Sequence, residues 1–265
     1  MAIRSLHAEL SLYPKPGLVS LIDNGSHADM TAETFMRSLF SLRHYFRDIA
    51  RAGAAAAGFD TLKRLGIAAE ARMLRATGGI NTHRGAIFSL GMLCAAIGYL
   101  QSRSMPLTAQ GIRNTLQAEW GEGLAAHTRD VSGTTHGLKV AALHAAAGAR
   151  EEVALGLPSL FEIALPRLQQ TLAAGRDAHA ARIDALFALM AHVSDTNVYH
   201  RGGVQGALMV REQARNFLAR GGTEQDDWPA QALRCHRLFV AQKLSPGGAA
   251  DLLAATCLVQ MALTA

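Results

Sequence analysis

Apolar residues recur at steps of three and four along most of the chain, and this spacing predicts amphipathic helices rather than strands. In the first such stretch the residues that share one face are Phe35, Leu39, Phe46 and Ile49. The pattern predicts a single helix here that ends near Gly53, because glycine commonly stops a helix.

The next two stretches differ in how much of their surface is apolar. Asp60 is placed to cap a second helix, which carries Leu62 and Met73 and ends at the pair Gly78-Gly79. The segment 83–100 is apolar nearly all round. A helix that is hydrophobic on every face must be surrounded by protein, so we expect residues 83–100 to form the central buried helix.

The second half of the chain carries further helix signals. Residues 112–120 show helical spacing, and so do residues 183–193, which follow a capping residue at Asp177. The pair Ser245-Pro246 predicts a helix start, with a capping hydroxyl followed by proline at the first helical position. The helix expected after it, residues 249–263, closes the chain.

The composition supports an all-α fold. The 265 residues include 49 Ala and 35 Leu but only 10 Val and 10 Ile. Alanine and leucine are good helix formers, whereas a buried sheet needs runs rich in valine and isoleucine. The chain is 49% hydrophobic and 18% charged, which is enough to bury a large core. No low-complexity linker divides it, so we expect one compact multi-helix domain over residues 1–265.

Charge and cysteine usage narrow the partners and the compartment. The formal net charge of +5 suggests an anionic partner, but the basic residues are spread along the chain without interleaved aromatics. Small anionic molecules are therefore favoured over nucleic acid. Cys94, Cys235 and Cys257 are widely spaced and form no CxxC pair, which suits a reducing cytoplasm. No signal peptide or membrane span is recognisable, so we expect a soluble cytoplasmic protein.

Polar residues gather in short glycine-punctuated segments between the expected helices. These segments are 13–19 with 25–30, Glu70 with 77–85, 133–137, 194–197 with 201–203, and 245–251. Several stand just before an expected helix, where free backbone N–H groups and glycine form cradles for anions. Segment 77–85 adds Asn, Thr, His and Arg donors. The GxxxxGK[ST] spacing of a Walker loop is absent.

Taken in order, PKPGLV, GSHADM, ExxM, TGGINTHRG, DTNxxxRGG and SPGGAADLLA resemble the motifs of triphosphoribosyl-dephospho-CoA synthases. The resemblance runs from Lys15 to Leu253, and TGGINTHRG is its most specific part. Such enzymes make the prosthetic-group precursor of citrate lyase and of biotin-independent malonate decarboxylase. PKPGLVS and GSH are closer to the malonate decarboxylase branch.

Two features depart from that family. A helix usually precedes the PKPG motif, and only about a dozen residues do so here, which leaves the completeness of the start open. Position 84 is arginine where the family leads us to expect lysine. Both are cationic, so contact with phosphate is retained, with a different geometry.

The resemblance implies that the 2′-hydroxyl of 3′-dephospho-CoA attacks C1 of the ATP ribose, and that adenine leaves while the triphosphate is retained. Positive charge develops on the sugar, as in glycoside cleavage. The reaction needs a triphosphate clamp with Mg²⁺, a base, a proton or hydrogen bond for adenine, and exclusion of water. The product implies an acyl carrier protein or its transferase as a partner. The sequence leaves the oligomeric state open, a homodimer included.

The matching segments contain residues for each need. We expect Asp29 and Asp195 to bind Mg²⁺, Glu70 to serve as base or metal ligand, and His27 and His83 to transfer protons. The expected substrate-binding residues are Lys15, Gly78, Gly79, Asn81, Thr82, Arg84, His136, Asn197 and Arg201.

The carboxylates also have structural interpretations. Asp29 can cap a helix that begins near Thr31, and Asp195 can end a helix and order a turn with Asn197. Asp251 can be a first-turn acid that favours the dipole of its own helix. For each residue taken singly, the structural and the functional interpretation are about equally supported.

Other interpretations of the whole chain also stay open. His83 and His136 can be hydrogen-bonded structural histidines. A nucleotide N-glycoside hydrolase would use the same site with water as the acceptor. A non-catalytic carrier of the prosthetic-group precursor would bind the finished product and release no adenine from ATP.

Overall fold

The computed structural model describes residues 1–129 and 148–265, and within these ranges every regular element is a helix. The α-helices of the first half are α1 (Ala2–Leu10), α2 (Ala32–Ser41), α3 (Arg43–Ala54), α4 (Phe59–Ala76), α5 (Arg84–Ser102) and α6 (Ala109–Arg129). Those of the second half are α8 (Ala149–Ala154), α9 (Leu165–Ala173), α10 (Ala178–His192), α11 (Thr196–Ala219), α12 (Trp228–Ala241) and α13 (Gly247–Leu263). A π-helix, η1 (Ser159–Ala164), precedes α9, and a 3₁₀-helix, η2 (Gly222–Glu224), precedes α12. The expected all-α class is confirmed.

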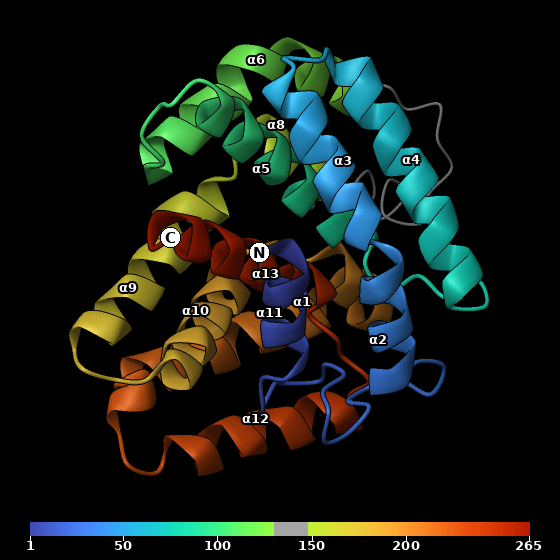
Figure 1. Ribbon diagram of the computed structural model, residues 1–265. Coiled ribbons are helices and arrows are strands. Elements are labelled where there is room, and N and C mark those ends of the chain that lie inside the picture. The colour runs from blue at the N-terminus through green and yellow to red at the C-terminus, as the bar shows by residue number, and fades with distance from the viewer. Residues whose placement is uncertain (130–147) are drawn as a thin grey trace.

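Two helices lie in the middle of the molecule rather than the one that the sequence predicts. Figure 1 shows α3, α4 and α6 on one side, α9 to α12 on the other, and α1 with α13 between them. Helix α5 is buried nearly throughout, as expected. Helix α13 is buried as well, because it packs against α1, α5, α10 and η1. The fold therefore has two central helices, α5 and α13.

One helix in the described ranges is long and apolar enough to cross a membrane, judged by length and composition. This helix is α5, and 72% of its most apolar window is buried inside the protein. Its apolar surface is thus covered by the other helices, as in the core of a globular fold.

Three expected helix boundaries are wrong in detail. Residues 35–49 form two helices, because the chain turns at Leu42 between α2 and α3. The N-cap of α4 is Gly58, and Asp60 lies inside its first turn. Helix α13 begins at Gly247, and the hydroxyl of Ser245 makes no cap bond to it. The expected Asp177 cap of α10 is confirmed, since its carboxylate accepts the N–H of Ala180.

Helices α3 and α5 pack closely because glycines face backbone at their contact. A Cβ on Gly53 would lie 2.1 Å from the carbonyl oxygen of Ala95, and one on Gly98 would lie 2.2 Å from that of Ala50. Such distances require the backbones to move apart, so alanine cannot replace either glycine without a shift of one helix. This contact holds α5 in place, and the N-terminus of α5 belongs to the site described below.

We predict that Gly98→Ala destabilises the fold, because overpacking of this kind costs about 1–3 kcal/mol. For a chain of this size the melting temperature should fall by about 2–4 °C for each kcal/mol lost. Gly121→Ala is the matched control: its Cβ would meet nothing within 4 Å, so only the better helix propensity of alanine acts there. Calorimetric melting of both variants checks this. A Gly98→Ala protein as stable as Gly121→Ala would refute the packing argument.

Candidate active site

A cavity of about 870 Å³ lies where the N-termini of α5, α11 and α13 meet. Its wall includes Arg84 and Gly85 from α5, Asn197 from α11, and Gly247 and Gly248 from α13. The first N–H groups of a helix have no partner within the helix and carry the positive end of its dipole. Three such ends around one cavity suit a ligand with several negative charges. The volume falls in the usual range for small-molecule sites, roughly 300–1,000 Å³.

The same cavity has an apolar wall. Its members are Tyr45, Ile49, Leu62, Phe88 and Met92, from α3, α4 and α5. An apolar surface of this kind excludes water and accepts a flat ring or a hydrocarbon chain. The site therefore combines cationic helix ends with a surface that can hold uncharged parts of a ligand.

His83 is the N-cap of α5 and is held by a short chain of hydroxyls. Thr82 Oγ1 donates to Ser38 Oγ at 2.7 Å, and Ser38 Oγ lies 2.6 Å from His83 Nδ1. Ser38 Oγ accepts the hydrogen bond from Thr82, so the hydroxyl of Ser38 can donate its own to Nδ1 of His83. Nδ1 is then the acceptor, and the ring proton is on Nε2. Within the described part of the chain Nε2 has no partner. Burial, with the charge of Lys15, lowers the pKa of His83 to about 3, so the ring is a neutral donor.

Glu70 and Arg84 form an ion pair across the cavity wall, from α4 to the start of α5. Arg84 Nε donates to Glu70 Oε1 at 2.6 Å, and Arg84 Nη2 lies 2.5 Å from the same oxygen. Asn81 holds the loop before α5, since its side-chain oxygen accepts the N–H of Arg84. Both members of the pair are about one third exposed, so a ligand can reach them.

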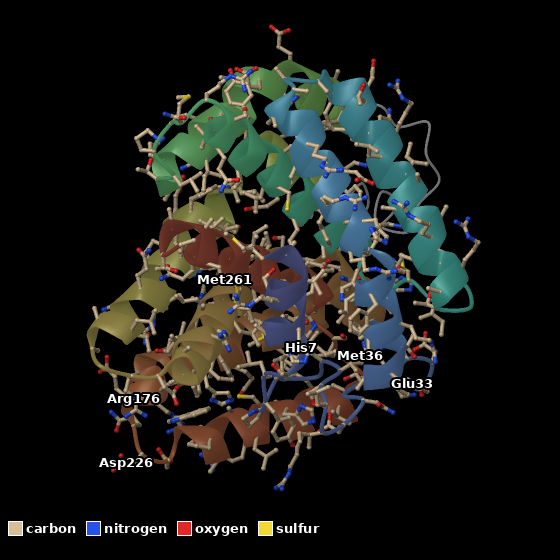
Figure 2. The ribbon with its side chains drawn as sticks, viewed as in Figure 1. His7, Glu33, Met36, Arg176, Asp226 and Met261 are labelled. Atoms are coloured by element: carbon tan, nitrogen blue, oxygen red, sulfur yellow. The ribbon has the colours of Figure 1, made fainter. Side chains whose placement is uncertain are left out.

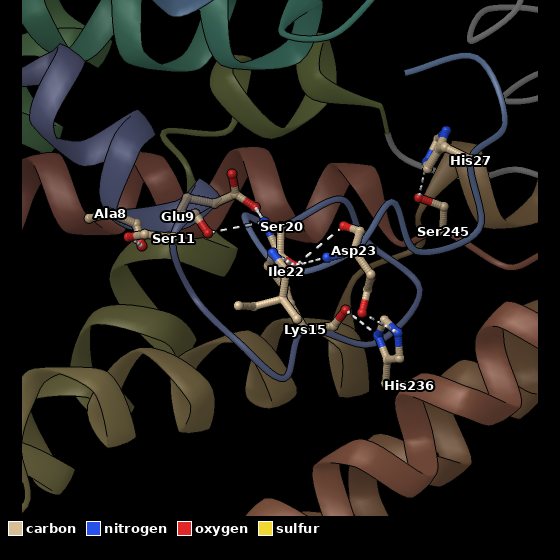
Figure 3. Close-up of polar contacts among 10 residues, drawn as sticks. All are labelled: Ala8, Glu9, Ser11, Lys15, Ser20, Ile22, Asp23, His27, His236 and Ser245. Carbon is tan, nitrogen blue, oxygen red and sulfur yellow. Dashed lines mark hydrogen bonds and ion pairs between the residues drawn. The ribbon is translucent and has the colours of Figure 1, made fainter. Parts of the chain in front are cut away.

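Lys15 and Glu9 form a second, fully buried ion pair (Figure 3). Lys15 Nζ lies 2.5 Å from Glu9 Oε1 and also donates to the backbone oxygen of Glu9 at 3.0 Å. Burial raises the pKa of Glu9 and lowers that of Lys15, and each charge opposes the shift of the other. Both residues line the cavity. The expected phosphate contact of Lys15 would use the one ammonium proton that these two bonds leave over.

His27 links the loop 25–30 to the starts of α11 and α13. Its Nε2 lies 2.8 Å from Ser245 Oγ, as Figure 3 shows, and Arg201 Nη2 lies 3.0 Å from its Nδ1. Burial lowers the pKa of His27, and the charge of Arg201 lowers it further. Asp29 lies 3.6 Å from His27 Nδ1 and is 63% exposed. Since Thr31 makes the capping box of α2, the interpretation of Asp29 as the cap of that helix is wrong.

Two aspartates connect the three helix starts. Asp195 is the N-cap of α11 and accepts the N–H of Asn197 at 2.9 Å. Its other oxygen accepts the N–H of Ala249 at 3.1 Å, in the first turn of α13. Asp251 lies beyond the first turn of α13 and faces the N–H of Ala86, in the first turn of α5. The interpretation of Asp251 as a first-turn acid of its own helix is therefore wrong: it serves the start of another helix.

Most of the expected site residues line this one cavity. These are Lys15, His27, Asp29, Glu70, Gly79, Asn81, Thr82, His83, Arg84, Asn197 and Arg201. Gly78 and Asp195 lie beside it, Gly78 in the turn after α4 and Asp195 behind the start of α11. His136 lies outside the described residues.

Glu9, His200 and Asp251 also line the cavity, although none of them was among the expected site residues. Asp251 belongs to the polar segment 245–251, so its position in that segment could have indicated a role in the site. Glu9 precedes every polar segment, and only the tertiary fold brings it to Lys15. Its detection would have required knowledge that residues 2–10 form a helix packed against α13.

The carboxylates differ in their fitness as metal ligands. The described residues contain no group of three or more His, Cys, Asp or Glu side chains that could hold a metal by themselves. Mg²⁺ often binds through one or two carboxylates together with substrate phosphates, so such a group is not required. Asp29 and Glu70 present oxygens to the cavity. The oxygens of Asp195 are occupied by backbone N–H groups of α11 and α13, so the geometry fits a helix cap better than a metal ligand.

Comparison with known proteins places the chain among enzymes. The family model described as CitG, ATP:dephospho-CoA triphosphoribosyl transferase, matches residues 1–264. A relative from Acinetobacter calcoaceticus, named probable 2-(5''-triphosphoribosyl)-3'-dephosphocoenzyme-A synthase, is 40% identical over 97% of this chain and 87% of its own. The synthase of that name from Pectobacterium atrosepticum is 38% identical over 96% of this chain and 85% of its own. No solved structure matches significantly.

The buried state of His83 predicts a pH-dependent stability. An unfolded histidine takes up a proton near pH 6.5, whereas folded His83 stays neutral down to about pH 3. Stability is therefore present above the unfolded pKa and is lost as the pH falls below it. Between about pH 7.5 and pH 5.5 the wild type should lose about 1.4 kcal/mol more than His83→Gln. Urea unfolding of both proteins across this range measures the difference. Identical pH dependence in the two would contradict a neutral buried His83.

Proposed function

The chain belongs to the ATP:dephospho-CoA triphosphoribosyl transferase family, and we propose that it moves the 5-triphosphoribosyl group of ATP to the 2′-hydroxyl of 3′-dephospho-CoA and releases adenine. The observation that carries this proposal is the cavity at the three helix N-termini. It offers positive ends for a triphosphate and an apolar wall for uncharged groups.

The triphosphate is the part of ATP that the helix ends suit best. Backbone N–H groups at the starts of α5, α11 and α13 can each donate a hydrogen bond to a phosphate oxygen. Arg84 and Arg201 line the same region and add fixed positive charge. Arg201 is itself held by the backbone oxygen of Ser26 and by His27, so His27 acts in this proposal as the residue that positions Arg201.

Glu70 is the proposed base for the attacking hydroxyl. It lines the cavity, and the Arg84 guanidinium beside it holds its carboxyl group in place. Asp29, exposed at the rim of the cavity, is the proposed ligand of Mg²⁺ together with the phosphates. The ion, when bound, would neutralise charge on the triphosphate. His83 Nε2 is a neutral hydrogen-bond donor for the substrate.

The biological setting is proposed from the sequence motifs. PKPGLVS and GSH favour the malonate decarboxylase system over the citrate lyase system, with its acyl carrier protein or transferase as the receiver of the product. The three cysteines are free and buried, which agrees with the reducing cytoplasm that we propose.

The mass of the product tests the proposed reaction. The chain is incubated with ATP, Mg²⁺ and 3′-dephospho-CoA, and the products are separated and weighed by mass spectrometry. We expect a dephospho-CoA adduct and one adenine for each adduct formed. Free ribose triphosphate without an adduct would identify a hydrolase instead. Tight binding of the finished product with no adenine release would identify a carrier.

Glu70→Gln tests the proposed base. We expect the rate of adenine release to fall by about 10²–10⁴-fold, the usual contribution of a positioned general base. Glu33→Gln is the matched control, because Glu33 also pairs with an arginine, Arg37, but on the outer face of α2 (Figure 2). It should retain the wild-type rate. Equal rates in the two variants would remove Glu70 from the mechanism.

A further inference from the structure

The cavity holds a carboxyl group that the proposed reaction has not yet used. Asp251 lines it and keeps part of its surface accessible. Within the described residues Asp251 belongs to no ion pair, in contrast to Glu70 and Glu9, which are paired with Arg84 and Lys15. A carboxyl group enclosed by protein without a cation favours its protonated form.

The groups around Asp251 strengthen this preference. Glu9 of α1 and Asp195 at the start of α11 both repel a negative charge on it, and among the described residues the N–H of Ala86 is the one contact that favours the charged form. Burial first, and then these two carboxylates, raise the pKa of Asp251 well above its usual value.

The position of Asp251 depends on Gly85. A Cβ at residue 85 would lie 2.2 Å from Oδ2 of Asp251. Only glycine at this position leaves room for the carboxyl group at the start of α5. His83, whose Nε2 has no partner within the described residues, lies in the wall of the same cavity. The carboxyl group of Asp251 therefore lies in the wall of the cavity that we propose for ATP.

The leaving group of the proposed reaction needs such a donor. Adenine departs with the electron pair of the C1–N9 bond, and a purine anion is a poor leaving group unless a ring nitrogen is protonated. We propose that Asp251 is the catalytic acid that protonates adenine as it leaves, an assignment that rests on the proposed function.

The step is balanced. The C1–N9 bond breaks while the bond from C1 to the 2′-oxygen of dephospho-CoA forms. The proton of Asp251 goes to adenine, and the proton of the 2′-hydroxyl goes to Glu70. Water then carries a proton from Glu70 back to Asp251, so adenine leaves as a neutral molecule and the enzyme is restored.

The test varies the leaving group. ATP is compared with 4-nitrophenyl riboside 5-triphosphate, whose nitrophenolate leaves as a stable anion without an acid. We expect Asp251→Asn to slow adenine release from ATP by about 10²–10⁴-fold and to slow nitrophenolate release by less than about tenfold. Gly85→Ala, which displaces the carboxyl group, should show the same selective loss and decides the question if Asp251→Asn does not fold.

Asp195→Asn is the matched control, because that nearby carboxyl group accepts N–H groups of two helix starts and does not line the cavity. Its substitution should lower the melting temperature and slow both leaving groups alike. A wild-type rate with ATP in Asp251→Asn, or equal losses with both leaving groups, would overturn the assignment.

The test of Asp251 can be distinguished from the test of the proposed transfer reaction. If the wild type releases adenine without forming an adduct, the transfer is wrong, and the ratio of the two rates still tests Asp251. If the wild type releases no adenine, both proposals fail together.

Discussion

The whole site depends on backbone N–H groups that must not stay unsatisfied. Three helices begin at one place inside the protein, and each start exposes donors that have no partner within the helix. Asp195 satisfies donors of α11 and α13, and Asp251 faces a donor of α5. These two carboxyl groups fix the helix starts relative to one another. Residues at all three helix starts line the cavity.

Several carboxyl groups lie inside the protein near one another, and each needs its own source of stabilisation. Buried carboxylates are unfavourable unless they are hydrogen-bonded, paired or protonated. Asp195 is hydrogen-bonded, Glu9 is paired with Lys15, and burial raises the pKa of Asp251 well above its usual value. Three carboxyl groups in one region therefore have three different environments. Differences of that kind allow neighbouring groups of one chemical type to take different roles in catalysis.

Much of the fold could be predicted from the sequence because helical periodicity and end signals are local. The buried helix α5, the Asp177 cap and the stop at Gly78-Gly79 follow from residues that are close in the chain. The break at Leu42 could not be predicted, because the apolar spacing continues through it. The second central helix, α13, required the tertiary contacts of α1, α5 and α10.

Part of the site could also be predicted from local sequence patterns. Residues of the glycine-punctuated segments gather at the cavity because those segments are the helix ends that meet there. The partners of the carboxylates were not accessible to sequence reasoning. Asp195 and Ala249 are far apart in the chain, and so are Asp251 and Ala86. A cap that one helix provides for another leaves no local pattern.

Hydrogen–deuterium exchange tests most directly whether the three helix starts hold the triphosphate. Exchange is followed by mass spectrometry with and without inorganic triphosphate, in peptides that cover residues 83–88, 195–200 and 246–251. The account predicts that triphosphate slows exchange in all three peptides together, because each contributes N–H groups to one anion site. Protection of one peptide alone, or of residues 58–63 at the separate pocket beside α4, would contradict it.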